Sequence, residues 1–134
     1  MSVPYFTPAR ARLALEFVRP ATERILRLYG MLERRHPLRS GPEEPVNPAY
    51  FRLLVRLNEA LERLAKRGVR VKDPKLGLVD FPALRAGREV WLCWKVGEAT
   101  VEYWHEREAG FAGRRRIDEE GPWGEARVEA KMPG

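Results

Sequence analysis

The stretch EVWLCWKVGEATVEYWHEREAGFAGRRR, residues 89–116, holds three of the four tryptophans in the chain, its only cysteine and one of its two histidines. Apolar and polar residues alternate over 89–96 and again over 100–106, as they do in strands with one buried face. The two segments are joined around Gly97 and Glu98, a sequence typical of a tight hairpin turn. This stretch therefore predicts two neighbouring antiparallel strands on which the rest of the fold is built.

The length of the turn decides which side chains share a face of this hairpin. If only two residues form the turn, Trp91 is expected opposite Trp104. Val90 is then expected opposite His105, and Cys93 lies on the other face from His105. Cross-strand aromatic pairs each stabilise a sheet by roughly 0.2–1 kcal/mol. Stability alone therefore accounts for most of the tryptophan cluster.

Residues 7–35 predict a first helix, with Thr7 as its N-cap and Pro8 at the first helical position. Apolar residues recur every three or four positions along it, as on one face of a helix. They are Leu13, Phe17, Ala21, Ile25, Leu28 and Leu32. Pro20 lies inside this pattern, and a kink is expected there because proline lacks the N–H that the helix requires.

Residues 47–67 predict a second helix, which Asn47 caps, Pro48 begins and Gly68 ends. Its apolar residues have the spacing of a coiled-coil seam. The seam consists of Tyr50, Leu54, Leu57, Leu61 and Leu64. This helix is expected to lie antiparallel to the first.

The fold class expected from these elements is α+β: a long antiparallel helical hairpin, with its first helix kinked at Pro20, packed on a small antiparallel β-sheet. Residues 69–106 are expected to form a β-meander in which Pro82 ends one short strand. Residues 107–134 are expected to form a loop and a tail. The whole chain, residues 1–134, is the size of a single domain.

Composition favours a cytoplasmic protein. No segment approaches the roughly 20 apolar residues of a membrane span, and the first residues lack the apolar core of a signal peptide. The single Cys93 cannot form an intramolecular disulfide. The chain has 20 Arg against 5 Lys, two Asn and no Gln. This bias predicts a heat-adapted protein, although a GC-rich genome produces the same excess of arginine.

The net charge of +6 lies entirely in the first half of the chain. Residues 1–68 carry 13 Lys and Arg against 7 Asp and Glu, whereas residues 69–134 carry 12 of each. A basic helical half can meet nucleic acid. It lacks the interleaved aromatic residues that stack on bases, so any such binding is expected to be weak and non-specific. A solvated, arginine-rich helix surface is the simpler interpretation.

Metal and nucleophilic chemistry find little support in the sequence. His36 and His105 are far apart in the chain and Cys93 is the only thiol, so no zinc-ligand set is expected. Cys93 and His105 are also the only thiol–base pair, and the expected register places them on opposite faces. Cys93 is therefore expected to be buried and inert, and no catalytic residue and no cofactor are predicted.

One candidate ligand site remains, at the end of the second strand of the hairpin. Gly110 and Gly113 allow the chain to turn back, so that Arg114 returns towards Glu106 and Asp80. The residues expected to gather there are Asp80, Trp104, His105, Glu106 and Arg114. They form a candidate site for a small anion, with a catalytic role left open. The alternative is a structural network of ion pairs.

The leading functional interpretation is a non-enzymatic binding protein that self-associates, most simply as a homodimer, through helix 47–67. The seam of this helix is heptad-like. Phe51, Leu53 and Val55 add apolar surface beyond what one small sheet can cover.

Three segments carry a family resemblance: YFTPARA (5–11), VKDPKLGLVDFPALRAGREVWLCWKVGE (71–98) and WHEREAGFAGRRR (104–116). They resemble a small prokaryotic family known only as domain of unknown function number twenty-two-zero-three. Members of that family typically have acidic residues after YFT, where this chain has Pro8-Ala9-Arg10. The resemblance implies a cytoplasmic prokaryotic protein, and it assigns no activity and no functional residue.

Overall fold

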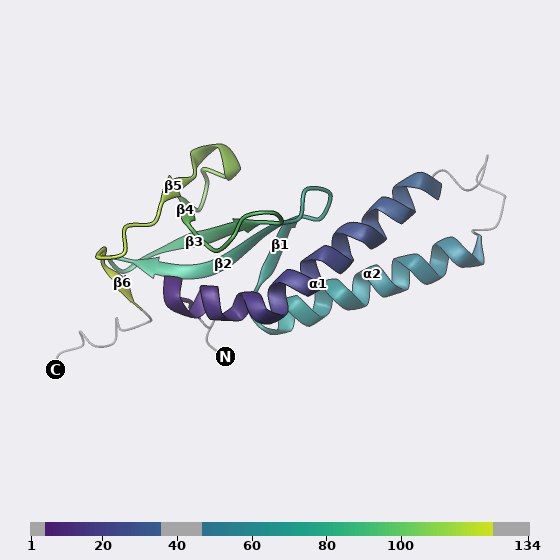
Figure 1. Ribbon diagram of the computed structural model, residues 1–134, viewed down its shortest axis with the longest axis horizontal. Helices are drawn as coiled ribbons and strands as arrows, with labels where there is room; N and C mark the ends of the chain where they lie inside the picture. The colour runs from purple at the N-terminus through teal and green to yellow at the C-terminus, as the bar shows by residue number, and fades with distance from the viewer. Residues whose placement is uncertain (1–4, 36–46, 125–134) are drawn as a thin grey trace.

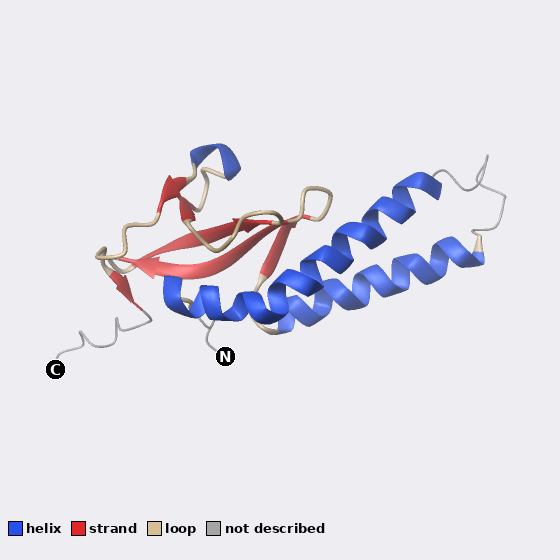
Figure 2. Cartoon of the chain, in the orientation of Figure 1, coloured by secondary structure: helices blue, strands red, loops and turns tan. Residues whose placement is uncertain are grey.

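The computed structural model describes residues 5–35 and 47–124, whose elements follow one another as in Figure 1. They are α1 (Pro8–Arg35), α2 (Pro48–Lys66), β1 (Arg70–Asp73), β2 (Leu78–Arg85), β3 (Arg88–Lys95), β4 (Tyr103–Glu106), the 3-10 turn η1 (Phe111–Gly113), β5 (Arg115–Arg116) and β6 (Trp123–Gly124). The strands form one antiparallel sheet in the order β1-β2-β3-β4-β5, and β6 pairs with β2. The α+β prediction is confirmed. Figure 2 shows the sheet at one end of the helical hairpin, whose other end projects beyond it.

Helix α1 begins where its cap predicts. The Thr7 hydroxyl accepts a hydrogen bond from the Arg10 N–H at 3.2 Å, as an N-cap side chain does. The helix continues through Pro20, and Figure 1 shows that it bends along its length. Pro20 cannot donate to the carbonyl of the preceding turn, which is the expected cause of the bend.

Helix α2 is bounded by the predicted signals. The Asn47 side chain accepts from the Ala49 N–H at 2.8 Å, and Pro48 occupies the first turn. Past the C-terminus, Gly68 has a φ of 84°, which glycine adopts without strain. The predicted set of seam residues is partly wrong, because Leu54 is exposed whereas Leu53 is buried in the core.

A single hydrophobic core lies between the helices and one face of the sheet. Its largest fully buried side chains are Trp94, Phe81, Ile25, Leu64 and Leu92. The helical pair is joined to the sheet by this core and by arginines from α1: the Arg12 Nε–H donates to the Val101 carbonyl at 2.9 Å. These contacts hold one end of the helical hairpin on the sheet.

Strand β2 continues beyond Pro82, where the sequence predicted its end. The Pro82 carbonyl accepts from the Phe6 N–H at 2.7 Å on the side away from β3. In an antiparallel strand the N–H and the carbonyl of a residue point to the same side. The N–H that Pro82 lacks would therefore point away from β3, towards the side where β1 no longer pairs with β2. The ladder between β2 and β3 loses no hydrogen bond.

The β3–β4 hairpin has a register shifted by one residue from the expected one. Trp91 lies opposite His105, and Cys93 lies opposite Tyr103. The expected pairing of Trp91 with Trp104 is therefore wrong. Because side chains alternate between the faces of a sheet, a shift of one residue exchanges the faces of the whole strand. His105 consequently lies on the same face as Cys93.

The turn between these strands is longer than two residues, which explains the shift. Strand β3 ends at Lys95 and β4 begins at Tyr103. The Glu98 carboxylate accepts from the Lys95 N–H at 2.9 Å, and the Glu98 carbonyl accepts from the Trp94 indole N–H at 3.0 Å. These side-chain contacts fix a wider connection in place of a tight turn.

The segment after β4, expected to be loop and tail, adds β5 and β6 to the sheet. Trp123 anchors it: its indole N–H donates to the Asp118 carbonyl at 2.9 Å. Its ring also packs edge-on against Trp104, with centroids 5.8 Å apart. Residues 125–134 of the predicted tail lie outside the described residues.

Candidate functional site

Three chemically reactive side chains meet on the sheet face opposite the core. Asp80 on β2, Cys93 on β3 and His105 on β4 are brought together by the observed register. One donor atom from each lies within 4.8 Å of the others. The relative exposures of the three residues are only 0%, 0% and 2%. A cluster of a carboxylate, a thiol and an imidazole is thus buried within the sheet.

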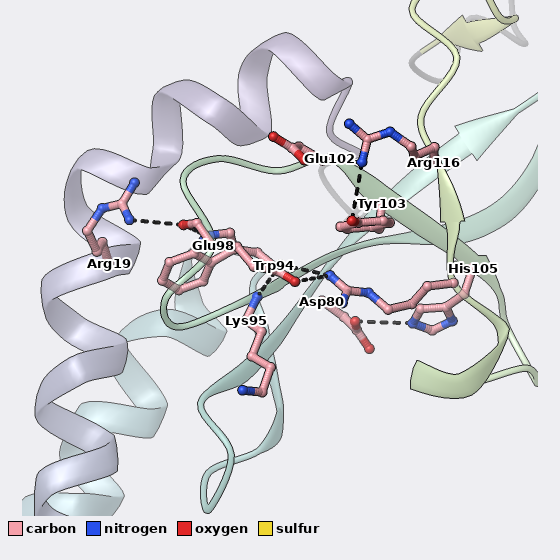
Figure 3. A network of polar contacts seen from close by, with 10 residues as sticks. Arg19, Asp80, Trp94, Lys95, Glu98, Glu102, Tyr103, His105 and Arg116 are labelled. Carbon is pink, nitrogen blue, oxygen red and sulfur yellow. Dashed lines mark hydrogen bonds and ion pairs between the residues drawn. The ribbon is translucent and has the colours of Figure 1, made fainter.

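Hydrogen bonds fix the orientation of the His105 ring. Nδ1 lies 2.7 Å from the Glu106 carbonyl oxygen, which can only accept, so Nδ1 carries a proton. Nε2 lies 3.2 Å from Asp80 Oδ1, and Figure 3 shows the Asp80 carboxylate facing the ring. The second carboxylate oxygen, Oδ2, accepts from Arg70 at 2.9 Å. Asp80 is thus paired with an arginine, but the partner is Arg70 and not the expected Arg114.

The protonation preferences of the cluster follow from its burial and its bonds. Burial alone lowers the pKa of His105, but the hydrogen bonds to Asp80 and to the Glu106 carbonyl outweigh it, and the pKa lies above its ordinary value. Burial, together with the negative charge of Asp80, raises the pKa of the Cys93 thiol to about 12. Cys93 is therefore a protonated thiol, unsuited to nucleophilic attack.

Arg114 lies elsewhere than the sequence predicted. Its guanidinium binds both carboxylate oxygens of Glu98, each at 2.8 Å, and it stacks on the rings of Tyr103 and Phe111 at 4.0 and 4.6 Å. The expected contacts with Glu106 and Asp80 are wrong. This cation is already neutralised by a bidentate carboxylate, which leaves little of its charge for an anion.

The other predicted residues are also separated. Glu106 pairs with Arg88 at 2.7 Å at the surface. Trp104 lies on the core face, where it contacts Trp123. Of the five side chains expected to form an anion site, only those of Asp80 and His105 bond to each other, and Glu106 contributes its backbone carbonyl alone.

Sequence reasoning missed Cys93 as a member of the cluster. The register expected from a two-residue turn places Cys93 and His105 on opposite faces, which excludes Cys93 from the site. The sequence feature that could have indicated the observed register is Glu98, whose carboxylate can accept a backbone N–H within a wider turn.

Truncation of Arg114 to alanine is expected to lower the free energy of unfolding by about 1.5–3 kcal/mol, the range for hydrogen bonds to charged groups. The side chains of Arg114 and Glu98 are only 12% and 25% exposed, so water does not replace the lost contact fully. Urea denaturation measures the difference. Arg116→Ala is the control, since Arg116 is 68% exposed and meets Glu102 only at 3.4 Å. The control is expected to cost less than about 1 kcal/mol, and equal losses in the two variants would contradict the assignment.

Comparisons with known proteins place the chain in a family without assigning it an activity. No helix in the described ranges 5–35 and 47–124 combines the length and apolar character needed to cross a membrane. Neither a curated protein nor a solved structure matches the chain. A family described as uncharacterized conserved protein (DUF2203) matches residues 4–117, which include every residue of the Asp80–Cys93–His105 cluster. The chain therefore belongs to the DUF2203 family.

Proposed function

We propose that this protein is a non-enzymatic binding protein that acts as a homodimer, with the projecting halves of two α1–α2 hairpins packed together. The observation that carries the proposal is an apolar stripe on α2. Phe51, Leu54 and Val55 are 59%, 40% and 39% exposed, respectively. They are spaced three and four residues apart, so they lie on one side of the helix. Leu53, expected to belong to this surface, is buried and does not.

The stripe borders a hollow between the two helices. The hollow has a volume of about 410 Å³. It is lined by Tyr29, Leu32, Glu33, Tyr50, Leu54 and Leu57. In Figure 1 this part of the hairpin projects beyond the sheet, so the sheet does not cover it. Two helices alone cannot bury all of their apolar surface, and a further layer is the usual solution.

A second copy of the hairpin supplies that layer. A two-fold axis makes the interface self-complementary, because the same surface of each copy contributes a projection and a recess. Phe51 is the projection and the hollow beside it is the recess. If the two α2 helices cross antiparallel near Val55, Arg52 of one copy lies near Glu59 of the other. Four helices packed in this way form a bundle, a common dimeric arrangement.

The alternative functions receive less support from the geometry. An anion site near His105 and Arg114 requires a free cation, and Arg114 is bound to Glu98. Nucleic-acid binding requires exposed cations. Several arginines from the basic half instead contact the protein: Arg19 stacks on Trp94 at 5.3 Å and Arg67 stacks on Phe17 at 4.2 Å. Catalysis is not favoured either, because the one thiol is buried and protonated.

The proposal extends to the setting in which the protein works. A reducing cytoplasm is consistent with a chain whose single cysteine is buried as a free thiol. The arginine-rich composition, without glutamine, supports a heat-adapted source. The family resemblance is the support for a prokaryotic one. Dimerisation through the hairpin adds buried area, which is one of the usual routes to heat stability.

Light scattering coupled to size exclusion tests the dimer. The wild-type protein is expected to show twice the 15.5 kDa mass of one chain over a range of micromolar concentrations. Phe51→Glu is expected to shift the mass to that of one chain, because it places a carboxylate in the centre of the apolar interface. The far-UV circular dichroism of this variant is expected to stay unchanged, since Phe51 contributes little to the core.

Leu13→Glu is the matched control for this experiment. Leu13 is 76% exposed on α1 and is not among the residues lining the hollow, so its substitution is expected to leave the dimer intact. A wild-type protein with the mass of one chain at all concentrations contradicts the proposal. So does a Phe51→Glu variant that remains a dimer.

A further inference from the structure

We propose that Asp80, Cys93 and His105 bind one divalent metal ion of the zinc class. They supply an oxygen, a sulfur and a nitrogen donor from three adjacent strands, all buried. Imidazole, thiolate and carboxylate are the donors that zinc accepts in proteins. This inference is independent of self-association, because the cluster lies on the sheet and not on the projecting part of the hairpin.

The distances within the cluster suit a tetrahedral ion. With metal–ligand bonds of about 2.0–2.2 Å, two tetrahedral nitrogen or oxygen ligands lie about 3.4 Å apart. His105 Nε2 and Asp80 Oδ1 are separated by 3.2 Å. Cys93 Sγ lies within 4.8 Å of a ring nitrogen of His105 and a carboxylate oxygen of Asp80, and it must approach to about 3.6 Å when the ion binds. The fourth position of a tetrahedral site is left for water or another small ligand.

Two of the three ligands are already oriented by outer hydrogen bonds. The His105 Nδ1–H donates to the Glu106 carbonyl, which leaves Nε2 as the metal-binding atom. Metal-bound histidines in proteins usually donate their other N–H to a carbonyl or carboxylate in this manner. Arg70 holds Asp80 Oδ2, so that Oδ1 is the oxygen presented to the ion. The chain thus provides the three ligands and also the hydrogen bonds that orient two of them.

Metal binding releases protons to solvent, because the Cys93 sulfur and His105 Nε2 must both be unprotonated to coordinate the ion. The thiolate and the Asp80 carboxylate then balance the two positive charges of the ion.

Burial of the donors determines how the experiment is performed. Because all three are inaccessible in the folded chain, the ion is expected to enter as the protein folds. Untagged protein is unfolded in guanidinium, refolded with Co²⁺ or Zn²⁺ or with EDTA, and freed of loose metal by gel filtration. We expect one metal ion per chain by elemental analysis. The cobalt form is expected to absorb through a thiolate-to-cobalt charge-transfer band, and the zinc form to melt several degrees above the EDTA form.

Two variants assign the ligands, and two others serve as controls. Cys93→Ala is expected to lose the charge-transfer band and most of the bound metal, and to remain folded because it removes only the sulfur atom. His105→Gln is expected to lose the metal as well. Glu89→Gln changes a surface carboxylate of β3 outside the cluster, and His36→Ala removes the other histidine of the chain. Both are expected to bind as the wild type does.

Either of two results overturns the inference. The first is wild-type protein that retains less than about a tenth of an equivalent of both metals after refolding, since a built site of this kind binds far more tightly. The second is a Cys93→Ala variant that is folded by circular dichroism and binds as much cobalt with the same spectrum. The dimer mass of the EDTA form is measured in parallel, so a failure here is distinguishable from a failure of self-association.

Discussion

Replacing Trp94 by alanine is expected to lower the free energy of unfolding by about 3–5 kcal/mol, the cost of truncating a large buried aromatic residue. Trp94 is fully buried in the core between the sheet and the helices. Its indole N–H donates to the Glu98 carbonyl at 3.0 Å, and Arg19 stacks on its ring at 5.3 Å. The substitution therefore creates a cavity and also releases the connection between β3 and β4. A loss of this size is a large part of the total stability of a domain.

Urea denaturation at a fixed protein concentration measures this effect, and Trp91→Ala provides the control. Trp91 is on the same strand but on the opposite face, where it is only partly buried beneath Arg70. Its truncation is expected to cost clearly less than that of Trp94. The reverse order would show that the sheet packs its other face on the helices. The midpoint must be compared at equal concentration because the proposed dimerisation would stabilise the folded chain.

The helices were predictable because their signals are local. Thr7 and Asn47 cap helices with their own side chains, and Gly68 adopts the positive φ that a helix end requires. These interactions involve residues no more than a few positions apart. The α+β class followed from the change of apolar period after Gly68.

The hairpin register was not predictable from the turn sequence. Gly97 and Glu98 satisfy the rule for a two-residue turn, yet the carboxylate of Glu98 bonds to the Lys95 N–H and to Arg114. The arginine comes from a segment 16 residues further along the chain. A tertiary contact therefore overrides a local preference, and one residue of shift moves His105 from the core face to the face of Cys93.

The ion-pair partners could not be predicted from the sequence either. The chain has 25 basic and 19 acidic residues, so each carboxylate has many possible partners. The sequence suggested Arg114 for Asp80 and Glu106. The structure pairs Asp80 with Arg70 across the β1–β2 ladder and Glu106 with Arg88 from the adjacent strand. Neighbouring strands supply these partners, and the strand order is known only once the register is known.

Removal of the Asp80 carboxylate is expected to destabilise the protein nearly as much as the loss of Trp94. Asp80 is fully buried and bonded to both Arg70 and His105. Asp80→Ala leaves the His105 ring buried with no partner for Nε2 and releases the Arg70 guanidinium. Removing one member of a buried ion pair typically costs about 3–5 kcal/mol, because the remaining group is buried without compensation. The measurement is made in EDTA, so that it reports the metal-free chain.

A double-mutant cycle separates the loss of the pair from the loss of one partner. Asp80→Leu and His105→Leu are each expected to be strongly destabilising alone, whereas the double variant is expected to be less destabilised than the sum by about 0.5–3 kcal/mol. Replacing a whole buried pair by apolar side chains removes the uncompensated group that each single variant leaves behind. Asp73→Ala is the control, because Asp73 caps an exposed turn at the Lys75 N–H and is expected to cost about 1 kcal/mol. Strictly additive losses in the cycle would show that Asp80 and His105 do not stabilise each other, and that the carboxylate is held by Arg70 alone.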